Sequence, residues 1–226
     1  LDDVALARIG QRVENEFVGA RVGIMDQMAC GLARAGEALF LDTLKLTYER
    51  IQLPLEQMDL IVVYSGVSHR LTGGGYNQRR AECEEACGML GIRSLREMKV
   101  SDLARLDGLP DVLKRRARHV ITENDRVLSA VDAIRAKDLG RLGKLFGESH
   151  ASMRDDYEVS IPEIDTLVEL LSHQADVYGA RLTGGGFGGS IVALSKKGRS
   201  GHVLESVLPE YQRKTGEKPV VLVGHL

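Results

Sequence analysis

Gly23-Ile24-Met25-Asp26-Gln27 links two helical patterns near the start of the chain and carries a single acid. The preceding segment, Asp3–Phe17, has apolar residues at spacings of three and four, which predicts a helix, and Gly19 stands where that helix would end. A second helix-compatible segment follows over Met28–Ala33. We therefore expect Asp26 in the first turn of a new helix, where an acid complements the helix dipole and caps free amides. This local pattern favours a structural use of Asp26, so a chemical use has to be argued from the rest of the chain.

The size and charge of the chain narrow the classes of partner. Its 226 residues make one large domain or two small ones, and 43% hydrophobic with 27% charged residues is ordinary for a soluble globular protein. A formal net charge of −2 gives no electrostatic reason to expect nucleic acid or an anionic membrane. Aromatic residues make up 4% without any Trp, which argues against base-stacking surfaces, and no apolar run approaches the ~20 residues of a membrane helix.

The three cysteines are Cys30, Cys83 and Cys87. An odd number without regular spacing argues against a disulfide framework and fits a reducing compartment, so we expect a cytoplasmic protein. Cys83 and Cys87 lie four residues apart on a predicted helix, but no His or further Cys pair stands nearby at zinc spacing. We expect both to be core-facing thiols.

The order of the predicted elements is that of an α+β protein. Three strands and a charged helix closed by Gly91 come first: Ala38–Asp42, Leu46–Leu53, Leu60–Ser65 and Asn77–Leu90. A helical region follows over Pro110–Lys137, Asp138–Tyr157 and Pro162–Ala175. The last elements are strand, strand, helix and strand: Gly179–Thr183, Ser190–Ser195, His202–Thr215 and Val220–Val223. This is no regular βα alternation, and we place a domain change near Gly66–Gly75, which divides the chain into residues 1–66 and 67–226.

Thr183–Gly189 is the densest cluster of glycines. Glycine permits close backbone approach and positive φ, which can turn amides toward an anion. The cluster is not a Walker A loop, because no Gly-Lys-Ser/Thr ends it and a predicted strand follows. A tight hairpin between two buried strands and a ligand-binding loop both remain open. The six histidines are scattered, and we assign no chemistry to any of them.

Five stretches spread over nearly the whole chain carry further short motifs. They are Gly23–Gln27, Gly75–Arg80 leading to Cys83-Glu84, Thr122–Asn124, Glu148–Glu158 and Arg181–Gly189. Each is modest evidence alone, but in this order the set resembles the galactokinases, within the GHMP small-molecule kinase superfamily. The resemblance implies the tail of an N-terminal α/β domain over residues 1–66, then a ferredoxin-like α+β C-terminal domain with a helical insertion over residues 67–226.

The resemblance also implies roles for individual residues. Asp26 is similar to the catalytic aspartate beside the anomeric hydroxyl of the sugar, Gly23 to a glycine whose backbone approaches the sugar, and Tyr76 to a tyrosine that hydrogen-bonds it. Glu14 has the position of an acid near the magnesium ion. The glycine cluster is similar to the third family motif, which lines the active site at the nucleotide; its glycines are Gly184, Gly185, Gly186, Gly188 and Gly189. The implied reaction converts ATP and α-D-galactose into galactose 1-phosphate and ADP, with ATP and Mg²⁺ as cofactors.

Two motifs of the resembled family do not occur in these residues. One is an arginine- and acid-bearing segment that binds the sugar and the transferred phosphoryl group, and the other is a Gly/Ser-rich loop that holds the ATP phosphates. We expect that the chain begins after both and is inactive by itself. Two other interpretations stay open: a non-catalytic galactose and ATP sensor on the same scaffold, or a related sugar 1-kinase for N-acetylgalactosamine or arabinose. An intact Asp26 favours an enzyme, and no oligomeric state is predicted.

Overall fold

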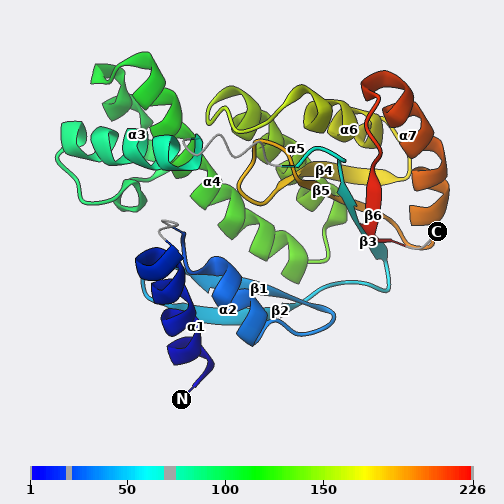
Figure 1. Cartoon of the computed structure of the whole chain (residues 1–226), viewed down its shortest axis with the longest axis horizontal. Coiled ribbons are helices and arrows are strands. Elements are labelled where there is room, and N and C mark those ends of the chain that lie inside the picture. Colours follow the sequence, from blue (N-terminus) through cyan, green and yellow to red (C-terminus); the bar gives the residue numbers. More distant parts are fainter. Residues whose placement is uncertain (1, 19–21, 69–74, 225–226) are drawn as a thin grey trace. The chain divides into compact units, whose positions relative to one another are not determined.

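The computed structural model describes residues 2–18, 22–68 and 75–224, which fall into two compact units (Figure 1). The first unit runs to Pro54 and includes Ile134–Ala136. The second unit comprises Leu55–Ala133 and the chain from Lys137 onward. Gly19 lies outside the described residues, as do residues 69–74 of the segment where we expected a domain change.

The first unit consists of two helices and a β-hairpin. Helix α1 spans Asp3–Arg12 and continues as a π-helical turn over Val13–Val18, so the helix predicted over Asp3–Phe17 is confirmed. The side chain of Asp2 caps α1 by accepting a hydrogen bond from the amide of Ala5 at 2.7 Å. Helix α2 spans Met25–Leu32 and begins one residue before Asp26, as expected. The two helices pack on a small core of Ala7, Ile24, Met28 and Leu32.

The hairpin of the first unit pairs β1, Glu37–Asp42, with β2, Thr47–Gln52, in an antiparallel register from Glu37↔Gln52 to Asp42↔Thr47. The turn forms because Asp42 Oδ1 accepts hydrogen bonds from the amides of Leu44 and Lys45 at 3.0 and 2.9 Å. Leu46 adopts a positive φ of 54° just before β2 begins. Within the described residues, this sheet has only the two strands.

The second unit is built on a four-stranded antiparallel sheet in the order β4-β5-β3-β6. The strands are β3 (Met58–Tyr64), β4 (Val177–Thr183), β5 (Ser190–Lys196) and β6 (Val220–Val223). With helices between β3 and β4 and between β5 and β6, the connectivity is β-α-β-β-α-β, the ferredoxin-like pattern that was predicted. Strand β3 belongs to this sheet, so the division between the compact units falls at Pro54 and not near Gly66–Gly75.

Three helices cover the sheet of the second unit: α5 (Leu139–Asp155), α6 (Pro162–Ser172) and α7 (Ser200–Thr215). Helices α5 and α6 pack on β4, α6 also contacts β5, and α7 contacts β3 (Figure 1). The core between them includes fully buried Ile61, Val63, Leu167, Leu182 and Ile191. Burial alternates along β3 from Asp59 to Tyr64, and buried apolar residues recur at helical spacing in α6, so each segment turns one face to the core.

The helical insertion between β3 and β4 has a core of its own. Helix α3 spans Gly75–Leu90 and ends at Gly91, whose φ of +67° allows the amide of Ile92 to reach the carbonyl of Cys87 at 3.1 Å. Two 3₁₀ segments, Leu95–Glu97 and Val100–Gly108, lead to the long helix α4, Asp111–Arg135. Their apolar side chains meet in a cluster of Ala86, Leu95, Met98, Leu106, Leu109, Leu113, Ala117 and Ile121. Cys83 and Cys87 are half-buried thiols that pack against this cluster, in agreement with the expected core-facing role.

Candidate functional site

Asp26 lies in the first turn of α2 with an exposed side chain. Ile24 stands at the N-cap of α2, and its side chain makes no cap bond. The helix dipole therefore acts directly on the carboxylate of Asp26. At Gly23, just before the helix, a Cβ atom would meet no described atom within 4 Å, so the backbone there is open to approach.

Glu14 and the Asp26 segment come together within the first unit. The side-chain amide nitrogen of Gln27 donates a hydrogen bond at 2.9 Å to Oε1 of Glu14, thirteen positions earlier in the chain. Both side chains border a groove of about 430 Å³ between α1 and α2, together with Asp26, Leu6 and Gly10. Three acids thus line the groove, Asp3, Glu14 and Asp26, and the last two are the predicted metal ligand and catalytic residue.

Tyr76 stands in the first turn of α3, and 50% of it is exposed. It borders a pocket of about 570 Å³ with Cys83 and Tyr157. The preceding residue, Gly75, lies so close to the ring of Phe187 that an added Cβ would be 2.7 Å from the ring Cζ. Because Phe187 belongs to the glycine-rich loop, the second unit brings the start of α3 and this loop together.

The glycine-rich loop is the hairpin between β4 and β5, and its backbone needs glycine. Positive φ values occur at Gly184, Gly186, Gly188 and Gly189, and at Phe187. A Cβ on Gly186 would meet the carbonyl oxygen of Val159 at 2.5 Å, and one on Gly188 would meet that of Val67 at 2.9 Å. The loop is therefore a tight hairpin, one of the two open interpretations, and a role in ligand binding stays a prediction.

Two amides of this loop already have carbonyl partners. The amide of Phe187 donates to Val159 O at 2.6 Å, and that of Gly189 donates to Val67 O at 3.0 Å. The amide of Ser65, at the end of β3, donates in turn to Gly189 O at 2.9 Å. A pocket of about 400 Å³ lies beside the loop, lined by Tyr64, Ser68, Thr183, Gly184, Gly189 and Ser190. The loop is thus fixed by the amides of Phe187 and Gly189, and residues at both of its ends line this pocket.

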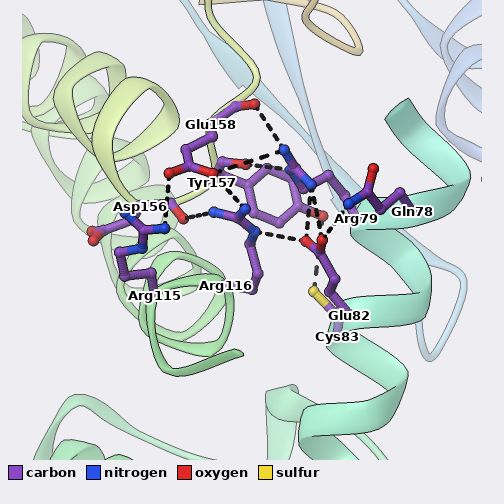
Figure 2. A network of polar contacts seen from close by, with 9 residues as sticks. All are labelled: Gln78, Arg79, Glu82, Cys83, Arg115, Arg116, Asp156, Tyr157 and Glu158. Atoms are coloured by element: carbon purple, nitrogen blue, oxygen red, sulfur yellow. Dashed lines mark hydrogen bonds and ion pairs between the residues drawn. The ribbon is translucent and has the colours of Figure 1, made fainter. Parts of the chain in front are cut away.

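A network of buried charges joins α3 to α4 and to the segment after α5. Glu82 Oε2 accepts hydrogen bonds from Arg79 at 2.9 Å and from Arg116 at 2.7 Å. Arg79 also donates to Tyr157 O at 2.6 Å, and Arg116 donates to Glu158 Oε2 at 2.6 Å. Figure 2 shows both guanidinium groups pointing at the Glu82 carboxylate from two helices. The network clamps the chain at Tyr157-Glu158, next to the Val159 carbonyl that holds the glycine-rich loop.

Sequence reasoning missed this network. Arg79 and Glu82 stand three residues apart on one helix, a local signal for an ion pair. The partners Arg116 and Glu158 are distant in the chain, so no sequence spacing reveals them.

The charges in the network shift one another's pKa values. Burial would raise the pKa of Glu82, but hydrogen bonds from Arg116 and Gln78 and the charge of Arg79 outweigh it and lower the pKa. The hydrogen bond from Arg116 is the main cause that lowers the pKa of Glu158. Burial raises the pKa of the Tyr157 phenol, and the neighbouring Cys83 raises it further. The two carboxylates are therefore held ionised and the phenol is held neutral.

A second polar cluster lies between α4, α5 and β4. Glu123 accepts hydrogen bonds from Ser149 Oγ at 2.5 Å, Arg126 Nε at 2.7 Å and Arg181 Nη1 at 3.0 Å. Burial would raise the pKa of Glu123, but the charge of Arg181 and these hydrogen bonds lower it. Beside it, burial lowers the pKa of His119 to about 4. The cluster joins three of the stretches on which the family resemblance rests.

Among residues 2–18, 22–68 and 75–224, no group of three or more His, Cys, Asp or Glu side chains converges as a metal site. Glu14 offers a half-buried carboxylate, the kind of oxygen ligand that Mg²⁺ takes, and its assignment stays a prediction. No helix in the described part of the chain is long and apolar enough to cross a membrane. Asp26 and Glu14 belong to the first unit, Tyr76 and the glycine-rich loop to the second, and their convergence on one cleft stays a prediction as well.

Comparison with known proteins gives a consistent result. Residues 130–213 match the family described as GHMP kinases C terminal. The chain is 45% identical to a galactokinase of Thermotoga petrophila over 211 residues, which are 93% of this chain and 59% of that protein. It is 44% identical to a galactokinase of Chloroflexus aurantiacus over 225 residues, or 96% of this chain and 57% of that protein.

Solved structures agree with these relatives. The crystal structure of Lactococcus lactis galactokinase complexed with galactose matches with a TM-score of 0.94 at 35% identity, over all of this chain and 60% of that one. Mevalonate kinase of L. major, at 18% identity and a TM-score of 0.60, shares the fold alone. The chain spans about three fifths of the length of the galactokinases it matches. The chain is therefore similar to the galactokinases over its length, and its residues 130–213 match the C-terminal part of the GHMP kinases.

Proposed function

We propose that this chain is part of an ATP-dependent kinase that phosphorylates α-D-galactose at its anomeric hydroxyl. The observation that carries the proposal is the 35% identity and TM-score of 0.94 to a galactokinase complexed with galactose, over the whole of this chain. The identity of 45% to a second galactokinase supports the same activity. The chain spans 59% of that relative, so the activity is proposed for the complete enzyme and not for these residues alone.

Asp26 is proposed as the catalytic residue. Phosphoryl transfer passes through a loose transition state, so positioning and charge neutralisation do most of the work. The hydroxyl of the sugar keeps its proton until late, and a carboxylate in hydrogen-bond reach orients it and then accepts that proton. The exposed first-turn position of Asp26 and the open backbone at Gly23 leave room for a sugar there. Tyr76 contributes a hydroxyl that both donates and accepts, which suits a sugar contact.

Glu14 is proposed to bind the metal, and the glycine-rich loop is proposed to bind the nucleotide. Mg²⁺ neutralises the phosphate charge when bound, and Glu14 is the proposed ligand because its half-buried carboxylate borders the same groove as Asp26. The glycine-rich loop is proposed to face the nucleotide, through Gly184, Gly185, Gly186, Gly188 and Gly189. The bare backbone at Gly184 and Gly185, where an added Cβ would meet no described atom within 4 Å, supports close approach of a phosphate.

A sugar panel tests the proposal. Full-length enzyme is assayed with ATP and Mg²⁺ on galactose, N-acetylgalactosamine, arabinose and glucose, with product identified by NMR. We expect galactose 1-phosphate as the main product. Preference for another sugar would point to the related sugar 1-kinase, and galactose binding without turnover would point to the sensor; either result would overturn the proposal.

The variant Asp26→Asn tests the catalytic role within the same assay. We expect kcat to fall by about a hundredfold or more, the order of a lost acid–base group, while the Kd for galactose changes little. Asp111→Asn is the matched control, because Asp111 is also an exposed acid in the first turn of a helix. Equal losses in turnover and in galactose binding would contradict the role.

A further inference from the structure

Two residues other than glycine adopt positive φ where the glycine-rich loop meets the segment after α5. Glu158 has a φ of 53°, and Phe187 in the loop has a φ of 60°. A large side chain at positive φ costs free energy, so the surrounding structure has to hold it there. Val159 connects the two residues, because it follows Glu158 and its carbonyl accepts a hydrogen bond from the Phe187 amide at 2.6 Å. Strained backbone of this kind clusters at functional sites, which directs attention to what holds it.

Two arginines hold the backbone of the strained segment. Arg79 of α3 donates to the carbonyl of Tyr157 at 2.6 Å and to that of Glu158 at 3.2 Å. Arg116 of α4 donates to the carbonyl of Asp156 at 2.6 Å. Three successive carbonyls, just before the one that the glycine-rich loop uses, are therefore fixed by two buried guanidinium groups (Figure 2).

Arg79 divides its donors between a carboxylate and the backbone. Its Nη1 donates to Glu82 at 2.9 Å, while Nε and Nη2 donate to the two carbonyls. The planar fork of arginine makes this division possible, and the single ammonium of lysine cannot reproduce it. An ion pair with Glu82 by itself would need only the charge. The carbonyl contacts thus give Arg79 a use that is separate from charge balance.

The same arginine stands on the helix that carries Tyr76. The two residues are three positions apart on α3. Gly75 precedes Tyr76, and an added Cβ there would lie 2.7 Å from the ring of Phe187, so this ring packs against the start of α3. The glycine-rich loop is therefore joined to α3 twice, by the Phe187 ring and by the backbone segment that Arg79 holds.

We propose that Arg79 is a positioning residue, which fixes the glycine-rich loop relative to Tyr76 through the carbonyls of Tyr157 and Glu158. The inference rests on the proposed function, which assigns the nucleotide to the loop and the sugar to Tyr76. Arg79 itself is assigned no contact with galactose or ATP. Loss of its fork should impair the enzyme through geometry, because a displacement of about 1 Å can cost about a hundredfold in rate.

The variant Arg79→Lys tests the proposal in the full-length enzyme, because it keeps the positive charge beside Glu82 and removes the fork. Amide hydrogen exchange is measured at single residues by NMR, and KM and kcat are measured with ATP and galactose. We expect exchange at the Phe187 amide to rise by about tenfold, while exchange at Ala193 in the central strand β5 stays unchanged. We expect the KM for ATP to rise by about tenfold. A smaller folded fraction lowers the apparent kcat but leaves KM unchanged, so a rise in KM separates positioning from stability.

Arg213→Lys is the control. Arg213 forks onto Glu210 three residues away on α7, at 2.9 Å, with 71% of its side chain exposed, and the variant should match the wild type in both measurements. Glu158→Gln is a second variant, which removes the ion pairs of Glu158 with Arg115 and Arg116 and should change both quantities in the same direction by a smaller factor. If Arg79→Lys does not fold, Glu158→Gln decides the question by the same two measurements.

The proposal is overturned if the folded variant leaves exchange at Phe187 or the KM for ATP unchanged. It is also overturned if exchange rises equally at Phe187 and Ala193, or if Arg213→Lys has the same effect. A wild-type enzyme that does not phosphorylate galactose would refute the proposed function. Exchange at Phe187 and the Kd for ATP would then still decide whether Arg79 positions the loop.

Discussion

Removal of the negative charge of Glu82 should destabilise the second unit strongly. The side chains of Glu82, Arg79 and Arg116 are only 13%, 10% and 3% exposed, so one carboxylate faces two guanidinium groups largely away from water. The substitution Glu82→Gln keeps the shape but leaves two buried guanidinium groups facing a neutral amide. Loss of one partner of a buried ion pair costs about 3–5 kcal/mol. We expect a value near the lower end, about 3 kcal/mol, because Glu158 still faces Arg116 at 2.6 Å.

Urea unfolding measures this loss. With an m value of about 2 kcal/mol/M, the midpoint should fall by about 1.5 M. The matched control is Glu84→Gln on the same helix, where Glu84 is 56% exposed in its contact with Arg80 and the expected loss is under about 0.5 kcal/mol. Equal effects of the two variants, or a loss below about 1 kcal/mol for Glu82→Gln, would refute the view that the network is a buried clamp.

The pH dependence of the unfolding free energy tests independently whether Glu82→Gln acts through charge. The folded-state pKa of Glu82 is lowered, so its contribution to stability is present above the unfolded-state value and is lost as the pH falls through the folded-state pKa. The difference in unfolding free energy between wild type and Glu82→Gln should therefore shrink below about pH 4. A difference that stays constant from pH 7 to pH 3 would show that the variant acts through packing and not through charge.

Three other changes are predicted. Gly143→Ala should lower the free energy of unfolding by about 1–3 kcal/mol, because a Cβ there would overlap the carbonyl of Tyr178. Gly147→Ala on the same helix should raise it by about 0.5–1 kcal/mol, because a Cβ there meets no described atom within 4 Å. Thermal unfolding of the two variants measures the difference. His119 stays neutral when folded down to about pH 4, so stability should fall as the pH drops from about 6.5 to 4, and His119→Gln should flatten that slope in pH-dependent urea unfolding. Tyr76→Phe in the full-length enzyme should raise the KM for galactose and weaken sugar discrimination, and an unchanged sugar profile would remove Tyr76 from the site.

The sequence predicts a regular element where a helical spacing or a short apolar run marks it. Helix α1 and strands β3 to β6 were located from spacings of three and four or from short apolar runs, with ends within a few residues. The 3₁₀ segment Val100–Gly108 was missed because its period of three residues is neither that of an α-helix nor that of a strand. The boundary at Pro54 was missed because strand pairing, not the glycine-rich segment, assigns β3 to the second unit.

For the candidate site too, the sequence predicts the local features but not the tertiary contacts. Local pattern placed Asp26 in a first helical turn, and the structure agrees. The contact between Glu14 and Gln27 and that between Gly75 and Phe187 are tertiary, so no spacing in the sequence predicts them. The roles of Asp26, Tyr76 and Glu14 came from the family resemblance, since a lone carboxylate or tyrosine at a helix start has no chemical signature of its own.

A crystal structure of the full-length enzyme with galactose tests the central claim most directly. The account predicts that one bound galactose lies within hydrogen-bond distance of both the Asp26 carboxylate, at its anomeric hydroxyl, and the Tyr76 phenol, with the glycine-rich loop beside the phosphoryl donor. A galactose that contacts Tyr76 while the Asp26 carboxylate remains far from its anomeric hydroxyl, with ATP and Mg²⁺ bound, would contradict it.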